Sequence, residues 1–194
     1  MSQSETSNQE SGTLKNRRLL LGVSGSIAAY KAAALTRLLV KAGAEVQVIL
    51  TEAATAFVTP LTLGTLSKKP VLTGFLRDVA SGQWHNHVEL GLWAEAYVIA
   101  PASANTIGQL ANGLCPNLLS AVYLSARCPV FLAPAMDLDM YAHPAVTQNM
   151  QRLRSFGNHV FDSPSGELAS GLAGPGRMLE PEDIVAELEK FFVR

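Results

Sequence analysis

Short apolar runs without alternation constrain the fold of this 194-residue chain more than any other feature. Four such runs occur, at residues 18–24, 45–50, 96–100 and 129–133. Continuous apolar runs are typical of parallel strands that are covered by helices on both faces. Segments with apolar residues at three- and four-residue spacing lie between them. The sequence therefore predicts a doubly wound α/β domain with a mainly parallel sheet.

The helical segments can be placed with similar reasoning, and they are expected at residues 27–42, 106–112, 117–126, 144–156 and 181–192. Gly43 is a natural stop for the first helix, which carries Lys31 on its polar edge, and Pro181 fits the first turn of the last one. Residues 1–16 have almost no apolar content, so we expect a disordered tail followed by one ordered domain over residues 17–194.

Composition excludes several classes of protein. Lys and Arg total 15 against 16 Asp and Glu, which argues against a nucleic-acid footprint. The charged share of 16% is low and is consistent with surface hidden in an oligomer. Two cysteines are too few for a disulfide scaffold, and no apolar run approaches the roughly 20 residues that span a bilayer. The first residues lack the apolar core of a signal peptide, so a cytoplasmic protein without nucleic-acid or membrane partners is expected.

Ligands of such sheets bind outside the carboxyl ends of the strands, so the segments that follow the strands are the candidate sites. The first strand runs into GVSGSIAAYK at residues 22–31, where a small-residue turn enters a helix. A helix start offers free N–H groups to an anion, and Ser26 is placed to cap the helix and to donate to a phosphate. The spacing fits neither GxxxxGK[ST] nor GxGxxG, and an ordinary tight turn is the alternative.

A second small-residue turn, PASANT at residues 101–106, follows the strand at 96–100. Ser103, Asn105 and Thr106 place small hydrogen-bonding side chains at a helix start, which again suits a phosphate. A plain helix cap is the alternative for this segment alone. Two such turns at one sheet favour a phosphorylated cofactor or substrate.

Three further segments allow a functional or a structural interpretation. Met136 and Met140, at four-residue spacing, are in isolation best explained as core, although the neighbouring Asp137 keeps a binding role open. His87 is either a general acid or base or a structural histidine, and no carboxylate or cysteine cluster completes a metal site around it. The glycines and proline of residues 166–178 predict a mobile loop or flap rather than a regular element.

These segments, taken in order, resemble the flavoprotein family of cysteine decarboxylases. The resemblance runs from about Arg18 to the end of the chain and is carried by GSIAAYK, TEAA, HVEL, PASANT, PAM and GLAGPGRM. The family includes phosphopantothenoylcysteine decarboxylase, alone or as the N-terminal half of a bifunctional coenzyme A enzyme, and the lantibiotic peptide decarboxylases. It implies a Rossmann-like subunit that binds FMN at the contacts of a homotrimer, which is often built into a dodecamer.

The resemblance also assigns roles to residues by position. His87 matches the catalytic histidine, and Asp137, Met140 and Arg177 are expected to bind a small phosphorylated substrate. The cofactor-binding residues are expected to be Gly25, Ser26, Ile27, Thr51, Ser103, Ala104, Asn105, Thr106 and Ala135. In the implied mechanism, the flavin oxidises the cysteinyl end to a thioaldehyde, which loses CO₂ to give an enethiol. Reduced flavin then returns the electrons, and the product is 4′-phosphopantetheine.

Two residues depart from the family pattern. Asp137 stands where an asparagine usually contacts the substrate carboxylate, so we expect it to be protonated, turned away or paired with a cation such as Arg177. Ser170 stands where the flap usually carries a cysteine that protonates the enethiol, and its catalytic role is therefore doubtful. Absence of that last step would leave the oxidised enethiol, as in the peptide decarboxylases.

The leading hypothesis is decarboxylation of 4′-phosphopantothenoylcysteine in coenzyme A synthesis, which the PAM segment and the GPGRM flap favour. The main alternative enzyme is a peptidyl-cysteine decarboxylase, and Ser170 is its chief support. A flavin prenyltransferase fits HVEL and the flap poorly. A non-catalytic FMN-binding regulatory subunit is a further alternative, against which His87 and the short, weakly acidic N-terminal segment argue.

Overall fold

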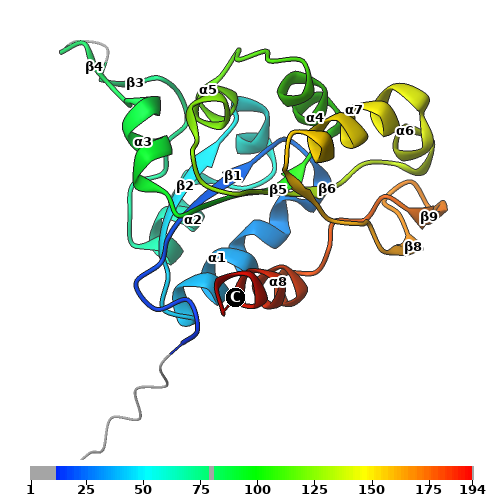
Figure 1. Cartoon of the computed structure of the whole chain (residues 1–194), viewed down its shortest axis with the longest axis horizontal. Helices are drawn as coiled ribbons and strands as arrows, with labels where there is room; N and C mark the ends of the chain where they lie inside the picture. The colour runs from blue at the N-terminus through cyan, green and yellow to red at the C-terminus, as the bar shows by residue number, and fades with distance from the viewer. Residues whose placement is uncertain (1–11, 79–80, 194) are drawn as a thin grey trace, which may run out of the picture.

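The protein forms a three-layer α/β domain in which helices cover both faces of one parallel sheet (Figure 1). The computed structural model describes residues 12–78 and 81–193. The sheet has the order β2-β1-β5-β6-β7, and every neighbouring pair in it is parallel. Its strands are β1 (Arg18–Val23), β2 (Glu45–Leu50), β5 (Ala96–Ala102), β6 (Val130–Pro134) and β7 (His159–Val160). The predicted fold class is confirmed.

Both faces of each central strand are buried, which explains the continuous apolar runs and agrees with the prediction from the sequence. In β1, Leu19 and Leu21 belong to one hydrophobic cluster and Leu20 belongs to the other. The first cluster lies under α1 (Lys31–Lys41) and α8 (Pro181–Val193), with α2 (Pro60–Ser67) against α1. The second lies under α4 (Ala104–Ala111), α5 (Leu118–Ser125) and α7 (Pro144–Ser155), with α3 (His87–Trp93) against α5. Within the described ranges, no helix is long and apolar enough to cross a membrane.

Several short elements were not foreseen. They are α2, α3, β7, η2 (Glu52–Ala56), α6 (Leu138–Ala142), and two antiparallel hairpins, β3 (Leu76–Asp78) with β4 (Gln83–Trp84) and β8 (Ser165–Glu167) with β9 (Ala173–Pro175). The helix expected at residues 27–42 is present as η1 (Ile27–Tyr30) followed directly by α1. The prediction that residues 166–178 form no regular element is wrong, because the β8–β9 hairpin forms there. At Gly174 an added Cβ would lie 2.6 Å from Cδ1 of Leu138, so this glycine serves close packing of β9 against α6.

The ordered chain also starts earlier than the sequence predicted. The backbone N–H of Leu14 donates to Ala42 O at 3.2 Å, and that of Asn16 donates to Gly43 O at 3.0 Å. Leu14 is fully buried in the cluster under α1. The expected disorder is thus wrong for residues 12–16, while residues 1–11 lie outside the described residues.

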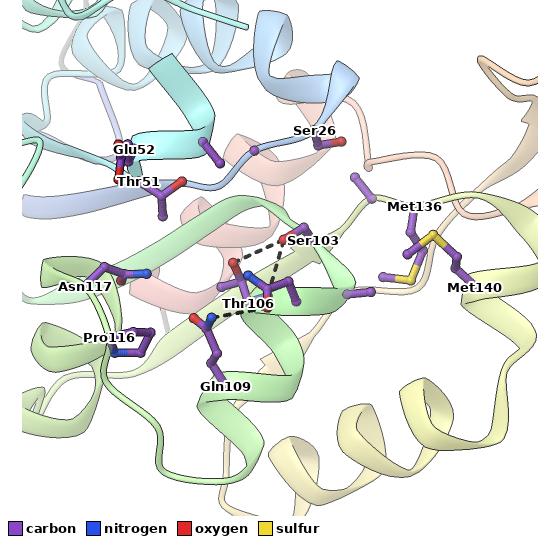
Figure 2. Close-up of a pocket in the computed structure, with 15 residues that line it drawn as sticks. Ser26, Thr51, Glu52, Ser103, Thr106, Gln109, Pro116, Asn117, Met136 and Met140 are labelled. Atoms are coloured by element: carbon purple, nitrogen blue, oxygen red, sulfur yellow. Dashed lines mark hydrogen bonds between the residues drawn. The ribbon is translucent and has the colours of Figure 1, made fainter. Parts of the chain in front are cut away.

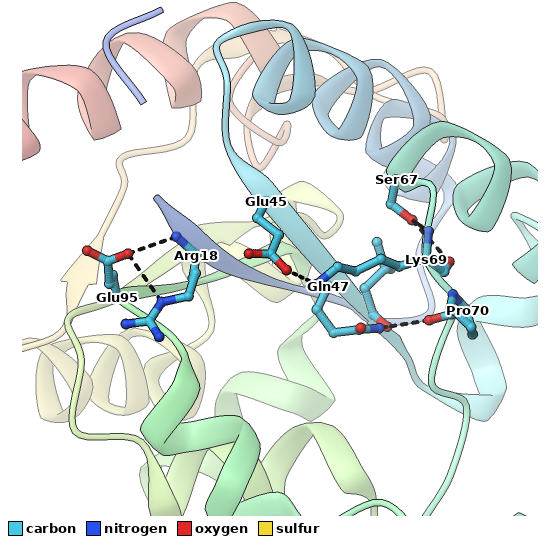
Figure 3. Close-up of polar contacts among 8 residues, drawn as sticks. Arg18, Glu45, Gln47, Ser67, Lys69, Pro70 and Glu95 are labelled. Atoms are coloured by element: carbon cyan, nitrogen blue, oxygen red, sulfur yellow. Dashed lines mark hydrogen bonds and ion pairs between the residues drawn. The ribbon is translucent and has the colours of Figure 1, made fainter. Parts of the chain in front are cut away.

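Polar contacts close the amino-terminal edge of the sheet (Figure 3). Glu95, just before β5, accepts from the Arg18 backbone N–H at 3.0 Å and pairs with Arg17 at 2.9 Å. The backbone hydrogen bond from Arg18, supported by Arg17, holds the pKa of Glu95 below its usual value. Lys69 pairs with Glu45 at the start of β2. Hydrogen bonds and ion pairs within the protein therefore satisfy the polar groups at the amino-terminal ends of the strands, whereas a cavity opens at the carboxyl-terminal ends.

Candidate functional site

A cavity of about 640 Å³ opens at the carboxyl ends of β1, β5 and β6. The strand order reverses its direction between β1 and β5, so the cavity lies at the topological switch point of the sheet, where ligands of such folds bind. Figure 2 shows Thr51 and Glu52 on one side of the cavity and Met136 and Met140 on the other. The lining residues are Gly25, Ser26, Thr51, Glu52, Ala53, Ser103, Ala104, Asn105, Thr106, Gln109, Pro116, Asn117, Ala135, Met136 and Met140.

The turn after β1 is packed tightly against the turn after β2. An added Cβ at Gly25 would lie 2.7 Å from Cβ of Ala53, so only glycine fits this approach without a shift. Ser26 caps η1, because its hydroxyl accepts from the Ala28 N–H at 3.2 Å. Thr51 caps η2 in the same way, accepting from the Ala54 N–H at 3.2 Å. The turns after β1 and β2, which line the cavity, are thus each fixed by a local side-chain cap.

The turn after β5 is tied to the turn after β1 by Ser24, a residue that sequence reasoning missed. Its hydroxyl donates to Pro101 O at 2.8 Å and accepts from the Ser103 N–H at 2.9 Å. Ser103 is the N-cap of α4 and accepts from the Thr106 N–H at 3.3 Å. The capping alternative is therefore correct for the Ser103 hydroxyl, which also lines the cavity.

Gln109 places an unsatisfied acceptor at the cavity wall. Its Nε2 donates to Asn105 Oδ1 at 3.2 Å, one helical turn earlier (Figure 2). Its Oε1 is buried and has no hydrogen-bond partner in the part of the chain that the structure describes. A buried acceptor without a partner costs about 1–3 kcal/mol, so a hydrogen bond from a ligand donor to this atom would be stabilising.

A second cavity of about 600 Å³ adjoins the first and shares Ser26, Ala135 and Met136 with it. It lies between η1 and the β8–β9 hairpin, whose turn contributes Leu168 and Ala169, and Ile27, Asp137 and Arg177 also line it. All residues predicted to bind cofactor or substrate therefore line one of two adjoining cavities. The interpretation of the methionine pair as core is wrong for Met140, which is 50% exposed.

Asp137 is held by its own helix rather than by a cation. Its Oδ1 accepts from the Leu138 N–H at 2.7 Å and caps α6. Arg177 contacts Glu180 instead, with Nη2 3.4 Å from Oε1. Of the three alternatives that the sequence left for Asp137, pairing with Arg177 is therefore not present, although both residues line the second cavity.

His87 and Ser170, the two residues given catalytic roles by position, line neither cavity. His87 is the first residue of α3, with its ring centroid 5.8 Å from that of Trp84 and 6.4 Å from that of Phe75. Its Nδ1 is buried without a partner among the described residues. Figure 1 shows α3 and the β3–β4 hairpin at the opposite end of the sheet from the β8–β9 hairpin. Ser170 is exposed in the turn of that second hairpin, accepting from the Leu172 N–H at 3.4 Å.

Several lining residues were missed because their sequence context carried little signal. They are Glu52, Ala53, Gln109, Pro116 and Asn117. Glu52 and Ala53 follow the second strand within TEAA, and that position at a carboxyl end was the available signal. Lys31, placed on a polar helix edge by the sequence, is instead buried.

Comparison with known proteins gives consistent matches. A family model described as Flavoprotein matches residues 7–193. The chain is 60% identical over 135 residues to a cysteine/cysteine sulfinic acid decarboxylase of an unknown prokaryotic organism, covering 70% of this chain and 37% of that protein. It is 46% identical over 179 residues to the coenzyme A biosynthesis bifunctional protein CoaBC of Bacillus subtilis (strain 168), covering 92% of this chain and 44% of that protein. The chain thus spans less than half the length of these relatives.

Solved structures match over nearly the full chain. A PPC decarboxylase with a cysteine-to-serine substitution, complexed with pantothenoylaminoethenethiol, superposes with a TM-score of 0.83 at 34% identity. That match covers 93% of this chain and 100% of the other. The FMN binding protein AtHal3 gives a TM-score of 0.79 at 33% identity, covering 91% of this chain and 97% of its own.

Proposed function

The chain belongs to the flavoprotein family, and we propose that it is an FMN-dependent decarboxylase that converts 4′-phosphopantothenoylcysteine to 4′-phosphopantetheine in coenzyme A synthesis. The observation that carries this proposal is the cavity at the switch point, lined by the turns after β1, β2, β5 and β6. The similarity to a PPC decarboxylase over the whole of that chain supports the same activity. A cytoplasmic location is part of the proposal.

The first cavity fits FMN on two observations. The close approach at Gly25 keeps the turn after β1 free of side-chain bulk, and the orphaned Oε1 of Gln109 suits a hydroxyl or ring N–H donor of the cofactor. Ser26, Thr51 and Asn105 would hold FMN together with the start of α4. The chemistry that FMN supplies is two-electron oxidation and reduction at the substrate carbon that carries sulfur, which creates the electron sink for loss of CO₂.

The second cavity is the proposed substrate site. It adjoins the first at Met136 and Ala135, so a cysteinyl end placed at this junction is beside the cofactor while the rest of the substrate extends under the β8–β9 hairpin. The cations Lys31 and Arg177 line this cavity, and Arg177, whose side chain is 40% exposed, is suited to a carboxylate or phosphate. Asp137 keeps its carboxylate on the Leu138 N–H, which turns its charge toward α6.

We propose that the site is incomplete within one chain and that a homotrimer completes it. His87 has a buried nitrogen without a partner and lies apart from both cavities. Apolar side chains around it are exposed, including Leu76, Trp84 and Val88, and further ones border the cavities at Ile27 and Tyr30. Large exposed apolar groups of this kind mark an interaction surface. In the trimer, His87 of a neighbouring subunit would reach the reacting end of the substrate and exchange a proton there.

Product identification tests the proposal. The purified protein is expected to be yellow, to release FMN on denaturation, and to form 4′-phosphopantetheine from 4′-phosphopantothenoylcysteine. Mass spectrometry separates this product from the enethiol, which has two hydrogens fewer. A colourless protein that cannot be reconstituted with FMN would overturn the cofactor assignment, and accumulation of the enethiol alone would favour the oxidative decarboxylases.

A second candidate activity is decarboxylation of free cysteine or cysteine sulfinic acid. Its support is the 60% identity to the protein named for that activity. Free cysteine would leave the wall of the second cavity around Ile27 and Arg177 without contacts. A kcat/KM that is higher for cysteine than for 4′-phosphopantothenoylcysteine would favour this candidate.

A further inference from the structure

Lys31 is a buried cation in an unfavourable position. It is only 8% exposed, although lysine is almost never fully buried without a partner. It is the first residue of α1, which continues directly from η1, so its side chain leaves the helix toward the protein interior rather than from a free end. A compensating partner is therefore needed.

Glu180 is that partner. Lys31 Nζ lies 2.7 Å from Glu180 Oε1 and donates to Met178 O at 3.2 Å. Both acceptors lie in the segment that connects β9 to α8. The same segment contacts the turn after β6, because Gly176 O accepts from the Met136 N–H at 3.0 Å. Lys31 thus lines the second cavity itself and also binds the segment that borders it.

One oxygen of Glu180 serves two cations. Its Oε1 accepts from Lys31 and also lies 3.4 Å from Nη2 of Arg177. The Arg177 side chain crosses β8 at Gly166, where an added Cβ would lie 2.7 Å from Nη1. Arg177 remains 40% exposed along its side chain and has five N–H donors, so the long contact to Glu180 leaves most of them for other acceptors.

We propose that Lys31 is a positioning residue: by occupying Glu180, it keeps the Arg177 guanidinium available to an anionic group of the substrate in the second cavity. Without Lys31, Glu180 has Arg177 as its nearest cation and draws the guanidinium away from the cavity. This inference rests on the proposed function, because the anion is a carboxylate or phosphate of that substrate.

Three variants of the FMN-loaded enzyme test this proposal: Lys31→Met, Glu180→Gln and the double variant. The proposal predicts that removing Lys31 and removing Glu180 affect KM in opposite directions. Lys31→Met is expected to raise KM about tenfold with kcat changed less, since one charge-assisted hydrogen bond to substrate is weakened. Glu180→Gln is expected to leave KM unchanged or lower it, and the double variant is expected to return KM toward that of the wild type. An ion pair that only stabilises the fold predicts instead that both single variants, and the double variant, lose activity together.

The matched control is Lys190→Met, which breaks an exposed pair with the same 2.7 Å separation, Lys190 with Glu187. Its KM is expected to stay at the wild-type value. Measuring KM for both pantothenoylcysteine and its phosphorylated form identifies the anion that Arg177 binds. If Arg177 binds the phosphate, the increase in KM caused by Lys31→Met should disappear with the substrate that lacks the phosphate.

A measurement without substrate separates failure of this inference from failure of the proposed function. Phenylglyoxal modifies free guanidinium groups, and mass spectrometry of the peptide that contains Arg177 gives its rate. Lys31→Met is expected to slow the modification of Arg177, and Glu180→Gln is expected to accelerate it. Equal rates in the wild type and Glu180→Gln would overturn the inference even if Lys31→Met did not fold, whatever substrate the enzyme uses.

Discussion

The cavity at the carboxyl ends of the strands and the region around His87 are built in opposite ways. Small residues and helix caps line the cavity, and Ser24 ties its walls together. Around His87 the side chains are aromatic or large, Trp84 is 52% exposed, and Nδ1 of His87 has no partner among the described residues. The first region is preorganised to receive a ligand. The second exposes large apolar side chains, which agrees with the interaction surface proposed above.

Replacing His87 should have the largest effect and should separate the two regions. We expect His87→Asn to lower kcat by about 10²–10⁴-fold, the usual contribution of a general acid or base. FMN content should remain that of the wild type, because His87 lines neither cavity. Steady-state kinetics and the flavin absorbance of the purified variant measure both quantities. Near-normal turnover would assign His87 a structural role.

Mixed oligomers would sharpen the comparison further. A subunit with His87→Asn keeps a complete cavity, whereas a subunit with a damaged cavity keeps its histidine. Co-expression of the two is expected to restore part of the activity that each lacks alone, because some sites then combine an intact cavity with an intact His87. Restoration would be absent if each chain used its own histidine.

The next largest effect is expected at Gly25. Gly25→Ala places a Cβ 2.7 Å from that of Ala53 and forces the turns after β1 and β2 apart. Overpacking of this kind costs about 1–3 kcal/mol, so FMN binding should weaken about tenfold or more. Gly74→Ala is the control, since its Cβ would meet nothing within 4 Å. Fluorescence titration of the apoproteins with FMN measures the affinity, and equal affinities would contradict the role of this turn.

The cavity, unlike the His87 region, was largely readable from the sequence. Its caps depend on neighbours in the chain: Ser26 on Ala28, Thr51 on Ala54 and Ser103 on Thr106. The buried strands were equally readable, because burial of both faces leaves an apolar run that no surface strand needs. These features are local, so residue type and spacing were sufficient for the strands and for the caps at Ser26 and Ser103, whereas Thr51 was assigned to the site by the resemblance to the family.

What the sequence did not predict depends on distant partners. Lys31 is buried because Glu180, 149 positions away, neutralises it. Leu14 is buried because the turn between α1 and β2 accepts its backbone hydrogen bond. The glycines of the β8–β9 hairpin predicted mobility, yet Gly174 is required by contact with Leu138 of α6. Contacts between residues that are far apart in the sequence leave no local pattern from which they could be predicted.

A smaller effect is expected from replacing Asp137, which lines the second cavity. Asp137→Ala removes the cap of α6 and should cost about 1 kcal/mol of unfolding free energy, whereas Asp137→Asn keeps a capping oxygen and should change stability little. Turnover should survive in Asp137→Asn if this residue only contacts substrate. Chemical denaturation and product analysis measure the two effects. Formation of the enethiol without the reduced product in Asp137→Asn would instead identify Asp137 as the proton donor.

The smallest effect is expected at Ser170, which belongs neither to the residues that line the cavities nor to the region around His87. It is exposed in the β8–β9 turn, and its hydroxyl accepts from the Leu172 N–H at 3.4 Å. A serine hydroxyl loses its proton many pKa units above the roughly 8.5 of a thiol, so it cannot replace a cysteine as an acid. Ser170→Ala should therefore leave the ratio of reduced product to enethiol almost unchanged.

Ser170→Cys completes that test because it supplies the acid that the family usually has at this position. The reductive step should be as fast as in the wild type or faster, and mass spectrometry of products at short reaction times measures it. A faster step would mean that the hairpin turn reaches the reacting group when substrate is bound, and an unchanged step would mean that another donor, such as Asp137 or a water, already suffices. Accumulation of the enethiol in Ser170→Ala would contradict both readings, because the hydroxyl itself would then be required for the proton transfer.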